Sequence, residues 1–266
     1  MAHSPRRIGF VLAATEHGTM ILNRFDYHHN DHGTYGVGSE LLDHGAYNAA
    51  EVGDVVTLLG VRRQHFGDGV VAVDCGANIG VHTLEWARSM TGWGSVIAIE
   101  AQERIFYALA GNLALNNCFN ARAILAAAAA ADGTMRIPCA DYLTPGSFGS
   151  LELQRSDDNE FIGQTVDYSA DKLTEIRALA IDSLDLARLD LMKIDVERME
   201  LEVLAGARQT IARCLPIIIV EQLKTNREAL TGALESHGHR LFYQAMNMFA
   251  IHPTDPSLDQ VVVLQG

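Results

Sequence analysis

The chain has 266 residues, a formal net charge of −13 and 48% hydrophobic residues. This composition predicts a folded chain with a packed core, either one large α/β domain or two small ones, and it excludes a disordered polymer. The acidic balance argues against a nucleic-acid partner, because phosphate backbones are bound through Lys and Arg and this chain has few lysines.

The four cysteines are far apart in the sequence and show no Cys-x-x-Cys spacing; they are Cys75, Cys118, Cys139 and Cys214. This spacing predicts neither a zinc knuckle nor a disulfide framework, and it favours a reducing, cytoplasmic compartment. No apolar run approaches the roughly 18 residues that a membrane span needs, so no membrane partner is expected.

The first part of the chain is predicted to be an N-terminal extension, residues 1–65. Residues 1–25 predict a β-hairpin that turns at His17-Gly18, and a polar, histidine-rich stretch follows over 26–38. Apolar residues at near-helical spacing predict a helix over 49–63. The hairpin offers an edge for strand pairing, which makes a homodimer possible.

From residue 70 onward, short apolar runs alternate with helical patterns. Strands are predicted over 70–73, 95–100, 121–126, 189–194 and 216–220, and helices over 80–90, 104–116, 200–213 and 225–236. Two last strands, 240–244 and 248–252, are close enough in sequence to be antiparallel neighbours. This alternation predicts an α/β domain over 66–266 with a doubly wound, mostly parallel sheet covered on both faces. The aperiodic segment at about 139–175 is expected to be an insertion.

In an open parallel sheet, the ligand lies beyond the carboxyl ends of the strands. Here the first strand runs into Asp74-Cys75-Gly76-Ala77-Asn78-Ile79-Gly80, and the second ends at Glu100. A dinucleotide fold favours Gly-x-Gly-x-x-Gly for its pyrophosphate, whereas a carboxylate at Asp74 would repel phosphate. S-adenosylmethionine carries a sulfonium, an amino group and a ribose but no phosphate, so it suits these acids better than NAD. An NAD-dependent oxidoreductase is the alternative.

Several motifs occur in a fixed order along the chain: Val73–Thr83, Ile99-Glu100, Asn112–Asn116, Leu191–Glu197 and Pro216–Glu221. Together they resemble the FkbM-type S-adenosylmethionine-dependent methyltransferases over about residues 45–221. The combination of Gly-Ala-Asn-x-Gly with Lys-Ile-Asp-Val-Glu is more specific than either motif alone. The resemblance implies the class I methyltransferase fold, a Rossmann-like seven-stranded sheet with an antiparallel last strand. It also implies O-methylation of a small-molecule or saccharide hydroxyl, with S-adenosylhomocysteine as the product.

The residues and the resemblance together give a set of expected cofactor-binding positions. The set is Asp74, Cys75, Gly76, Ala77, Asn78, Gly80, His82, Thr83, Glu100, Ala101, Gln102, Asn116 and Ala127. Asp74 stands in an apolar strand, where an acid needs a partner, and Glu100 could accept hydrogen bonds from both ribose hydroxyls. Asn116 and Ala127 follow from the resemblance alone, as contacts on the adenosine side, and Thr83 matches the family's hydroxyl position.

Methyl transfer from a sulfonium is an in-line displacement, so alignment of the acceptor oxygen supplies much of the acceleration. A positioned base typically adds ~10²–10⁴-fold. We hypothesise that Asp195 or Glu197 accepts the hydroxyl proton, while Lys193 and Glu221 orient the acceptor or tune the acids. Strand alternation predicts that Lys193 and Asp195 lie on one side of the sheet. The alternative is that Asp195 merely caps the helix that follows.

The chain departs from the family pattern at three positions. Arg198 follows Asp-Val-Glu where the family usually has Gly, Ala101 stands in place of Pro, and Asn48 follows Tyr47 in place of Glu. Arg198 matters most, because a bulky cation there could reshape the acceptor pocket, bind an anionic acceptor or damage activity. A catalytically silent S-adenosylmethionine-binding protein is therefore a further alternative.

The histidine-rich stretch contains potential metal ligands, namely His28, His29, Asp31 and His32, with His44 nearby. Nothing in their spacing fixes a tetrahedral site, so solvated or loop-lining side chains are the better interpretation and no metal is predicted. If the stretch folds over the strand ends, these residues could line the acceptor pocket together with Tyr35 and Tyr47.

Overall fold

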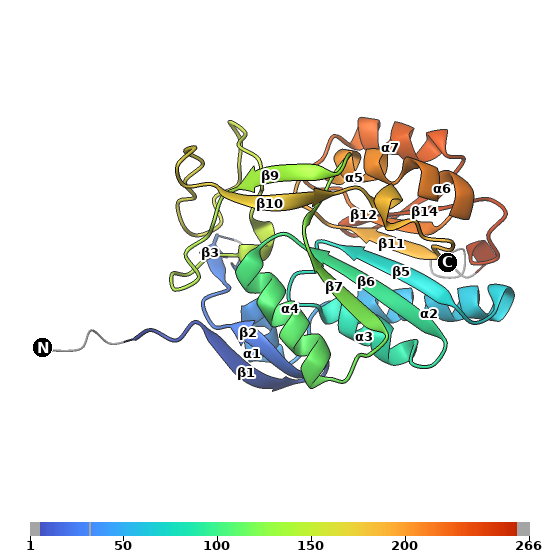
Figure 1. Cartoon of the computed structure of the whole chain (residues 1–266). Helices are drawn as coiled ribbons and strands as arrows, with labels where there is room; N and C mark the ends of the chain where they lie inside the picture. The colour runs from blue at the N-terminus through green and yellow to red at the C-terminus, as the bar shows by residue number, and fades with distance from the viewer. Residues whose placement is uncertain (1–5, 32, 260–266) are drawn as a thin grey trace, which may run out of the picture. The chain divides into compact units, whose positions relative to one another are not determined.

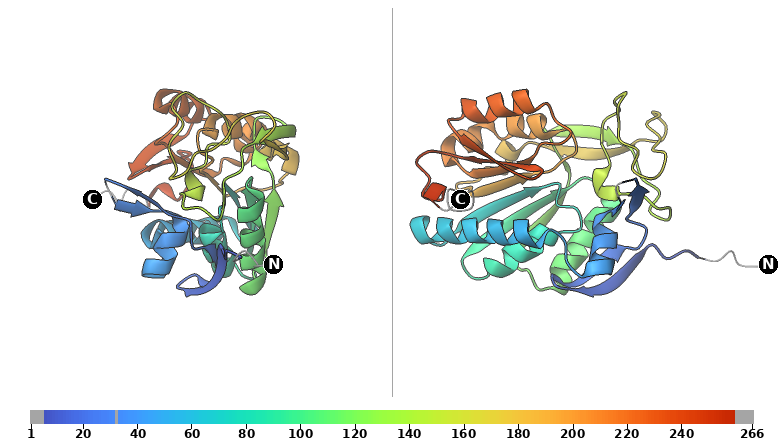
Figure 2. Two further views of the ribbon diagram at one scale, coloured as in Figure 1. Left: turned by 90° about the vertical axis from the view of Figure 1, so that its left-hand side faces the viewer. Right: turned by 180° about the vertical axis from the view of Figure 1, so that it is seen from behind.

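The computed structural model describes residues 6–31 and 33–259. The chain forms two compact units. One unit combines the described residues up to Tyr47 with Arg136–Thr174, and the other combines Asn48–Met135 with the described residues from Glu175 onward. Figure 1 and Figure 2 show the elements along the chain from three sides.

The first unit is built from two hairpins and short helices. Its elements are β1 (Phe10–Thr15), β2 (Gly18–Asn23), β3 (His28–Asn30), β4 (Gly33–Tyr35), α1 (Val37–His44) and the 3₁₀ helix η1 (Phe148–Ser150). The predicted N-terminal hairpin is confirmed, since β1 and β2 pair antiparallel with Thr15 opposite Gly18. Part of the histidine-rich stretch, for which the sequence predicted no strands, forms the second hairpin, β3–β4.

Asp26 joins two parts of this unit that are distant in sequence. Its carboxylate is buried and accepts the backbone N–H groups of Gly38 and Phe148, each at 2.9 Å. An isolated β-bridge also joins Asp26 to Gly146. Burial raises the pKa of Asp26 to about 6, against the opposing effect of the two amide donors.

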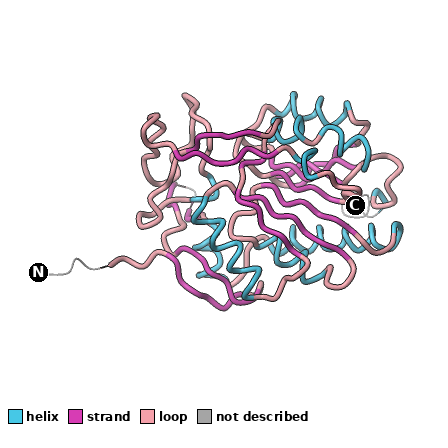
Figure 3. The backbone as a smooth tube through the Cα atoms, viewed as in Figure 1, coloured by secondary structure: helices cyan, strands magenta, loops and turns pink. Residues whose placement is uncertain are grey.

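The second unit is organised around a seven-stranded sheet (Figure 3). Its strands are β5 (Val70–Cys75), β6 (Gly94–Glu100), β7 (Ala121–Leu125), β11 (Leu191–Ile194), β12 (Ile217–Glu221), β13 (Arg240–Gln244) and β14 (Asn247–Ile251). They lie in the order β13-β14-β12-β11-β5-β6-β7, and only β14 runs antiparallel to its neighbours. The doubly wound sheet with an antiparallel last strand, expected of a class I methyltransferase, is confirmed.

Helices cover both faces of this sheet (Figure 1). One face carries α2 (Ala49–Phe66), α3 (Val81–Ser89) and α4 (Glu103–Leu115), and the other carries α5 (Glu200–Gly206), α6 (Arg208–Cys214) and α7 (Arg227–Ser236). The helix α2, which the sequence analysis assigned to the N-terminal extension, packs here on α3 and β5. No helix in the described part of the chain is long and apolar enough to cross a membrane.

The single helix predicted over 200–213 is wrong, because the helix breaks at Ala207 into α5 and α6. The side chain of Asp182 supplies the reason. Its two carboxylate oxygens accept the backbone N–H groups of Gln209 and Thr210, at 3.0 and 2.8 Å. A carboxylate in this position satisfies the free amides of a new helix start.

A smaller, three-stranded sheet was not expected from the sequence. It consists of β8 (Ala127–Ala128), β10 (Thr174–Leu179) and β9 (Gly133–Ile137) in that order, and the 3₁₀ helix η2 (Ile181–Leu184) follows β10. Within it, Ala127 and Ala128 pair in parallel with Ala178 and Leu179. The pairing converts part of an alanine run, which has high helix propensity, into strand.

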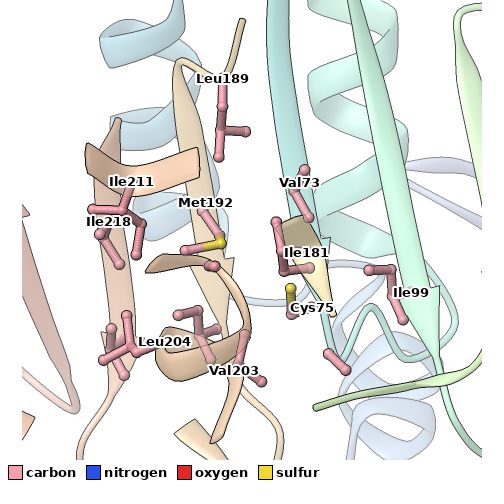
Figure 4. Packing of buried hydrophobic residues seen from close by; sticks show 14 of the residues in the cluster. Val73, Cys75, Ile99, Ile181, Leu189, Met192, Val203, Leu204, Ile211 and Ile218 are labelled. Carbon is pink, nitrogen blue, oxygen red and sulfur yellow. The ribbon is translucent and has the colours of Figure 1, made fainter. Parts of the chain in front are cut away.

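One hydrophobic core cluster lies between the sheet and α5–α7 (Figure 4). Sheet residues that contribute include Val73, Cys75, Ile99, Met192 and Ile218, and they face Val203, Leu204 and Ile211 from the helices. Side chains alternate across a strand. The residues next to these in the strands, Asp74, Glu100 and Lys193, therefore point to the opposite face, which α2–α4 cover.

Candidate active site

The turn after β5 fixes the ends of three strands. The amides of Gly76 and Ala77 donate to the Ile99 carbonyl at 2.9 and 3.0 Å. Gly76 has φ +78°, and a Cβ atom there would lie 1.8 Å from the carbonyl oxygen of Asp195. Gly80 has φ +92°, and its Cβ would lie 2.6 Å from Leu109 Cδ1. Both glycines are thus required by the protein's own packing.

Asp74 is an acid with one oxygen available. The side chain is 1% exposed, and the Thr83 hydroxyl donates to its Oδ2 at 2.6 Å. Its Oδ1 is buried and has no hydrogen-bond partner among the described residues. Burial raises the pKa of Asp74, and Lys193, opposite it in the register of β5 and β11, acts in the other direction. The expectation that this acid needs a partner is therefore met in part, by Thr83 and Lys193.

Glu100 ends β6 on the same face of the sheet as Asp74. It is 5% exposed, and its Oε2 and Oε1 accept the amides of Asn78 and Gln102 at 2.9 and 2.8 Å. Burial raises the pKa of Glu100 to about 7, against the effect of these amide donors. Two fixed backbone donors orient the carboxylate and leave further lone pairs for a ligand.

Lys193 and Asp195 form a pair at the end of β11. Lys193 is 5% exposed, and its Nζ donates to Asp195 Oδ2 at 2.8 Å. Burial opposes the charge of Lys193, but Asp195, Asp74 and Glu51 together raise its pKa above the ordinary value, so it remains an ammonium. The predicted same-side placement is confirmed. The capping alternative for Asp195 is wrong, because α5 begins at Glu200 and its N-cap residue is Met199.

A second lysine–carboxylate pair lies beside the first. Lys224 Nζ donates to Glu197 Oε2 at 2.6 Å. Burial raises the pKa of Glu197 to about 8 and that of Glu221 to about 7. The charge of Lys224 opposes the rise in both pKa values. Glu221, at the end of β12, accepts the Leu223 amide at 2.8 Å. Three acids expected from the sequence, Asp195, Glu197 and Glu221, are thus brought into electrostatic contact.

The backbone after β11 takes an uncommon conformation. Glu197 and Arg198 have φ values of +53° and +79°, in the left-handed region that favours glycine. A glycine at position 198, as the resemblance implies for the family, would suit this backbone, and this chain adopts it with an arginine.

Sequence reasoning missed two charged residues of the site, Glu51 and Lys224. Glu51 comes from α2; its Oε1 lies 3.6 Å from His82 Nε2, and its pKa is raised by burial. His82 also packs edge-on against Trp86, with ring centroids 5.6 Å apart. The signal for Lys224 was present in the sequence, because it is one of three lysines and follows a strand end by three residues.

Three expected positions have other surroundings. The Cys75 side chain lies in the hydrophobic cluster on the opposite face of the sheet, and burial raises the pKa of its thiol. Asn116 ends α4, and its side-chain amide donates to the Asn112 carbonyl at 2.8 Å. Ala127 is buried in β8. Cys75 and Ala127 can therefore contribute through their backbones only. Ala101 follows β6 directly, and Gln102 is the N-cap residue of α4.

The histidine-rich stretch belongs to the first unit. His28 packs edge-on against Tyr35 and Phe161, and the Thr34 hydroxyl lies 2.5 Å from His29 Nδ1. Within residues 6–31 and 33–259, no group of three or more His, Cys, Asp or Glu side chains is placed to hold a metal ion. His32 lies outside the described residues. The expected contribution of this stretch to an acceptor pocket stays a prediction.

The donor set fits a cationic nucleoside ligand better than a dinucleotide. The buried Asp74 Oδ1, without a hydrogen-bond partner in the described part of the chain, suits a positively charged group. Neither Lys nor Arg occurs between Asp74 and Thr83. A pyrophosphate bound at this turn would therefore meet an acid and no cation from the turn itself.

Comparison with known proteins gives one family match. A family described as the methyltransferase FkbM domain matches residues 74–246, more than half of the chain. The chain is similar to the structure of methyltransferase FkbM from Methylobacillus flagellatus, with 18% identity and a TM-score of 0.49, covering 72% of this chain and 48% of that one. It is also similar to precorrin-6y C5,15-methyltransferase from Geobacter metallireducens, with 15% identity, a TM-score of 0.43, and 77% and 88% of the two chains covered.

The chain thus spans less than half the length of the Methylobacillus protein. None of the curated proteins matches it significantly. Both TM-scores are below 0.5, so the assignment of the chain to a family depends on the family match over residues 74–246.

Proposed function

The chain belongs to the FkbM methyltransferase family, and we propose on this basis that it is an S-adenosylmethionine-dependent O-methyltransferase. The acceptor is a hydroxyl of a small molecule or saccharide. The observation that carries the proposal is the buried Asp74 Oδ1, which has no hydrogen-bond partner in the described part of the chain and lies at the strand edge where Glu100 ends β6.

The cofactor site would be formed by the ends of β5 and β6. Asp74 would hold the positively charged part of the cofactor, and Glu100, oriented by the Asn78 and Gln102 amides, would accept the ribose hydroxyls. When bound, S-adenosylmethionine supplies a methyl group on a sulfonium and leaves as S-adenosylhomocysteine. The Gly76–Gly80 turn, fixed by its contacts with Asp195 and Leu109, would keep these acids in place before the ligand arrives.

The acceptor site would lie at the ends of β11 and β12. Asp195 or Glu197 would accept the hydroxyl proton as the acceptor oxygen bonds to the methyl carbon. Lys193 holds Asp195 at 2.8 Å and Lys224 holds Glu197 at 2.6 Å, so both acids are oriented by a cation. Orientation of this kind and a positioned base are the two contributions that methyl transfer requires from the protein.

Calorimetry on the purified chain tests the cofactor assignment. We expect binding of S-adenosylmethionine and S-adenosylhomocysteine and no binding of NAD. Mass spectrometry of the protein as purified would show whether an adenosyl compound is already bound. Binding of NAD in their place would contradict the proposal and favour an oxidoreductase.

A screen of hydroxyl-bearing small molecules and saccharides, read by S-adenosylhomocysteine release, tests the activity. Release that depends on an acceptor supports O-methyl transfer. Cofactor binding with no release for any acceptor would favour a catalytically silent binding protein.

A further inference from the structure

The three lysines of the chain lie in different environments. Lys172 is at the surface, with 61% of its side chain exposed beside Asp171. The other two, Lys193 and Lys224, lie at the candidate site, and each is paired with one acid of the Asp195–Glu197 segment. The side chains of Lys224 and Glu197 are only 17% and 16% exposed. A largely buried ion pair of this kind differs from an exposed one, because both charges have lost most of their contact with water.

The two pairs differ in what surrounds them. Lys193 faces Asp74 and Glu51 as well as Asp195, so its charge is shared among three acids. Lys224, from the loop after β12, donates to Glu197. Two acids also raise the pKa of Glu197, Asp195 from its own segment and Glu221 at the end of β12.

This difference separates the roles of the two acids. Asp195 is held by the Lys193 ammonium, whose charge Asp74 and Glu51 also stabilise. Glu197 is largely buried and close to two other acids, and its pKa of about 8 lies near the operating pH of most enzymes. A group with this property is well matched to taking up a proton and releasing it again.

We propose that Lys224 is a positioning residue for Glu197, and that Glu197, rather than Asp195, accepts the proton of the acceptor hydroxyl. The inference rests on the proposed methyl transfer. In that step the acceptor oxygen bonds to the methyl carbon, the carbon–sulfur bond breaks with its electron pair left on sulfur, and the hydroxyl proton passes to a Glu197 oxygen. Lys224 holds this carboxylate in place and favours its ionised form before the transfer.

The first test compares the pH profiles of kcat for Lys224→Met and Lys224→Arg, with Lys172→Met as the matched surface control. Loss of the ammonium makes Glu197 harder to ionise, so Lys224→Met should move the acidic limb to higher pH by one unit or more, about tenfold in rate per unit below the limb. Lys224→Arg should restore most of the wild-type profile, and Lys172→Met should leave it unchanged. An unchanged profile for Lys224→Met would overturn the inference.

The second test needs neither cofactor nor acceptor. The side-chain carboxyl of Glu197 is followed by ¹³C NMR in glutamate-labelled protein, and its signal is assigned with Glu197→Gln. We expect its titration midpoint to be higher in Lys224→Met than in the wild type and unchanged in Lys172→Met. An unshifted midpoint overturns the role of Lys224.

The two tests separate failure of this inference from failure of the proposed function. A wild-type chain that methylates no acceptor, yet shows the shifted titration, contradicts the proposed function while the Lys224–Glu197 pair stands. A wild-type chain that methylates, with Glu197→Gln fully active and Asp195→Asn inactive, keeps the function and assigns the proton to Asp195 instead.

Discussion

The two ends of the central sheet use buried charges in opposite ways. At the amino ends of the strands, Asp190 is fully buried and accepts hydrogen bonds from Arg62 Nε at 3.0 Å, from Arg188 Nε and Nη2 at 2.7 and 3.0 Å, and from the Val71 amide at 2.9 Å. Arg62 also pairs with Asp255. A cavity of about 410 Å³ opens beside this network, but the two acids that line it already have cationic partners.

At the carboxyl ends, acids outnumber cations. Asp74, Glu100, Asp195, Glu197 and Glu221 face Lys193 and Lys224, and the pKa values of Glu100, Glu197 and Glu221 are raised by burial. Buried charges that are all paired with opposite charges of the protein support the fold. A buried excess of one sign costs stability and is typical of a functional site. The comparison predicts that removing an acid has opposite consequences at the two ends.

The largest effect is expected for Asp190→Ala at the amino end. The variant leaves Arg62 and Arg188 without their shared buried carboxylate, and the free energy of unfolding should fall by about 3–5 kcal/mol. Urea denaturation measures it. Asp68→Ala is the matched control, because Asp68 pairs with Arg63 at the surface at 2.8 Å, and its removal should change stability by less than about 1 kcal/mol. Equal losses in the two variants would show that the amino-end network does not support the fold.

A pH dependence of stability is the next largest effect, and Glu100 is one of its sources. Its pKa is about 7 in the folded chain against an ordinary value of 4.5, so the folded state binds the proton more tightly. The tighter proton binding stabilises the folded state. This contribution to the free energy of unfolding is present below pH 4.5 and is lost as pH rises through 7, by about 3 kcal/mol in total. Urea denaturation across this range should show the decline in the ligand-free chain. Glu100→Gln should make that part of the curve less steep, since Asp26, Glu197 and Glu221 contribute the rest, and an unchanged slope would contradict the contribution of Glu100.

Asp74→Asn tests whether a buried charge at the carboxyl end serves ligand binding and not stability. The amide oxygen can still accept the Thr83 hydroxyl, while one buried negative charge disappears. We expect the free energy of unfolding to be unchanged or slightly higher and the affinity for S-adenosylmethionine to fall about tenfold or more, because an interaction with a charged group is worth ~1.5–3 kcal/mol. Calorimetry and urea denaturation measure the two. Glu103→Gln, at an exposed acid of α4, is the control that should alter neither; a destabilised Asp74→Asn with unchanged affinity would reverse the interpretation.

The sequence was sufficient to predict the parts of this site that depend on strand order and side-chain alternation. Continuous apolar runs predicted the strands, and alternation placed Lys193 and Asp195 on one side, where they form a pair. Glycine positions marked the turn after β5, although the contact that requires Gly76, the Asp195 carbonyl, comes from a strand far away in sequence.

The parts that could not be predicted depend on contacts distant in sequence. Glu51 lies in a helix whose place on α3 and β5 no local pattern reveals, and Lys224 follows a strand in a loop without periodicity. The break at Ala207 depends on a cap supplied by Asp182 from another element. The short strand β8 depends on pairing with β10, which overrides the helix propensity of its alanines.

The smallest effect is expected at Arg198, where the comparison concerns backbone rather than charge. A non-glycine residue at φ +79° costs about 1–3 kcal/mol, and glycine removes that strain at a cost of about 0.5–1 kcal/mol in unfolded-state entropy. Arg198→Gly should therefore raise the free energy of unfolding by about 1 kcal/mol. Arg198→Ala is the matched control, because it removes the same guanidinium but keeps a Cβ atom and hence the strain.

Urea denaturation of the two variants separates the backbone from the side chain. A more stable Arg198→Gly beside an unimproved Arg198→Ala would show that this chain tolerates strain in order to carry an arginine at the proposed acceptor site. Kinetics would then show what the arginine does. If it binds an anionic acceptor, both variants should raise KM for that acceptor while kcat changes less. The reason is that the lost contact would be equally strong in the ground state and the transition state. Equal stabilities in the two variants would instead mean that the left-handed backbone is imposed by neighbouring packing without measurable cost.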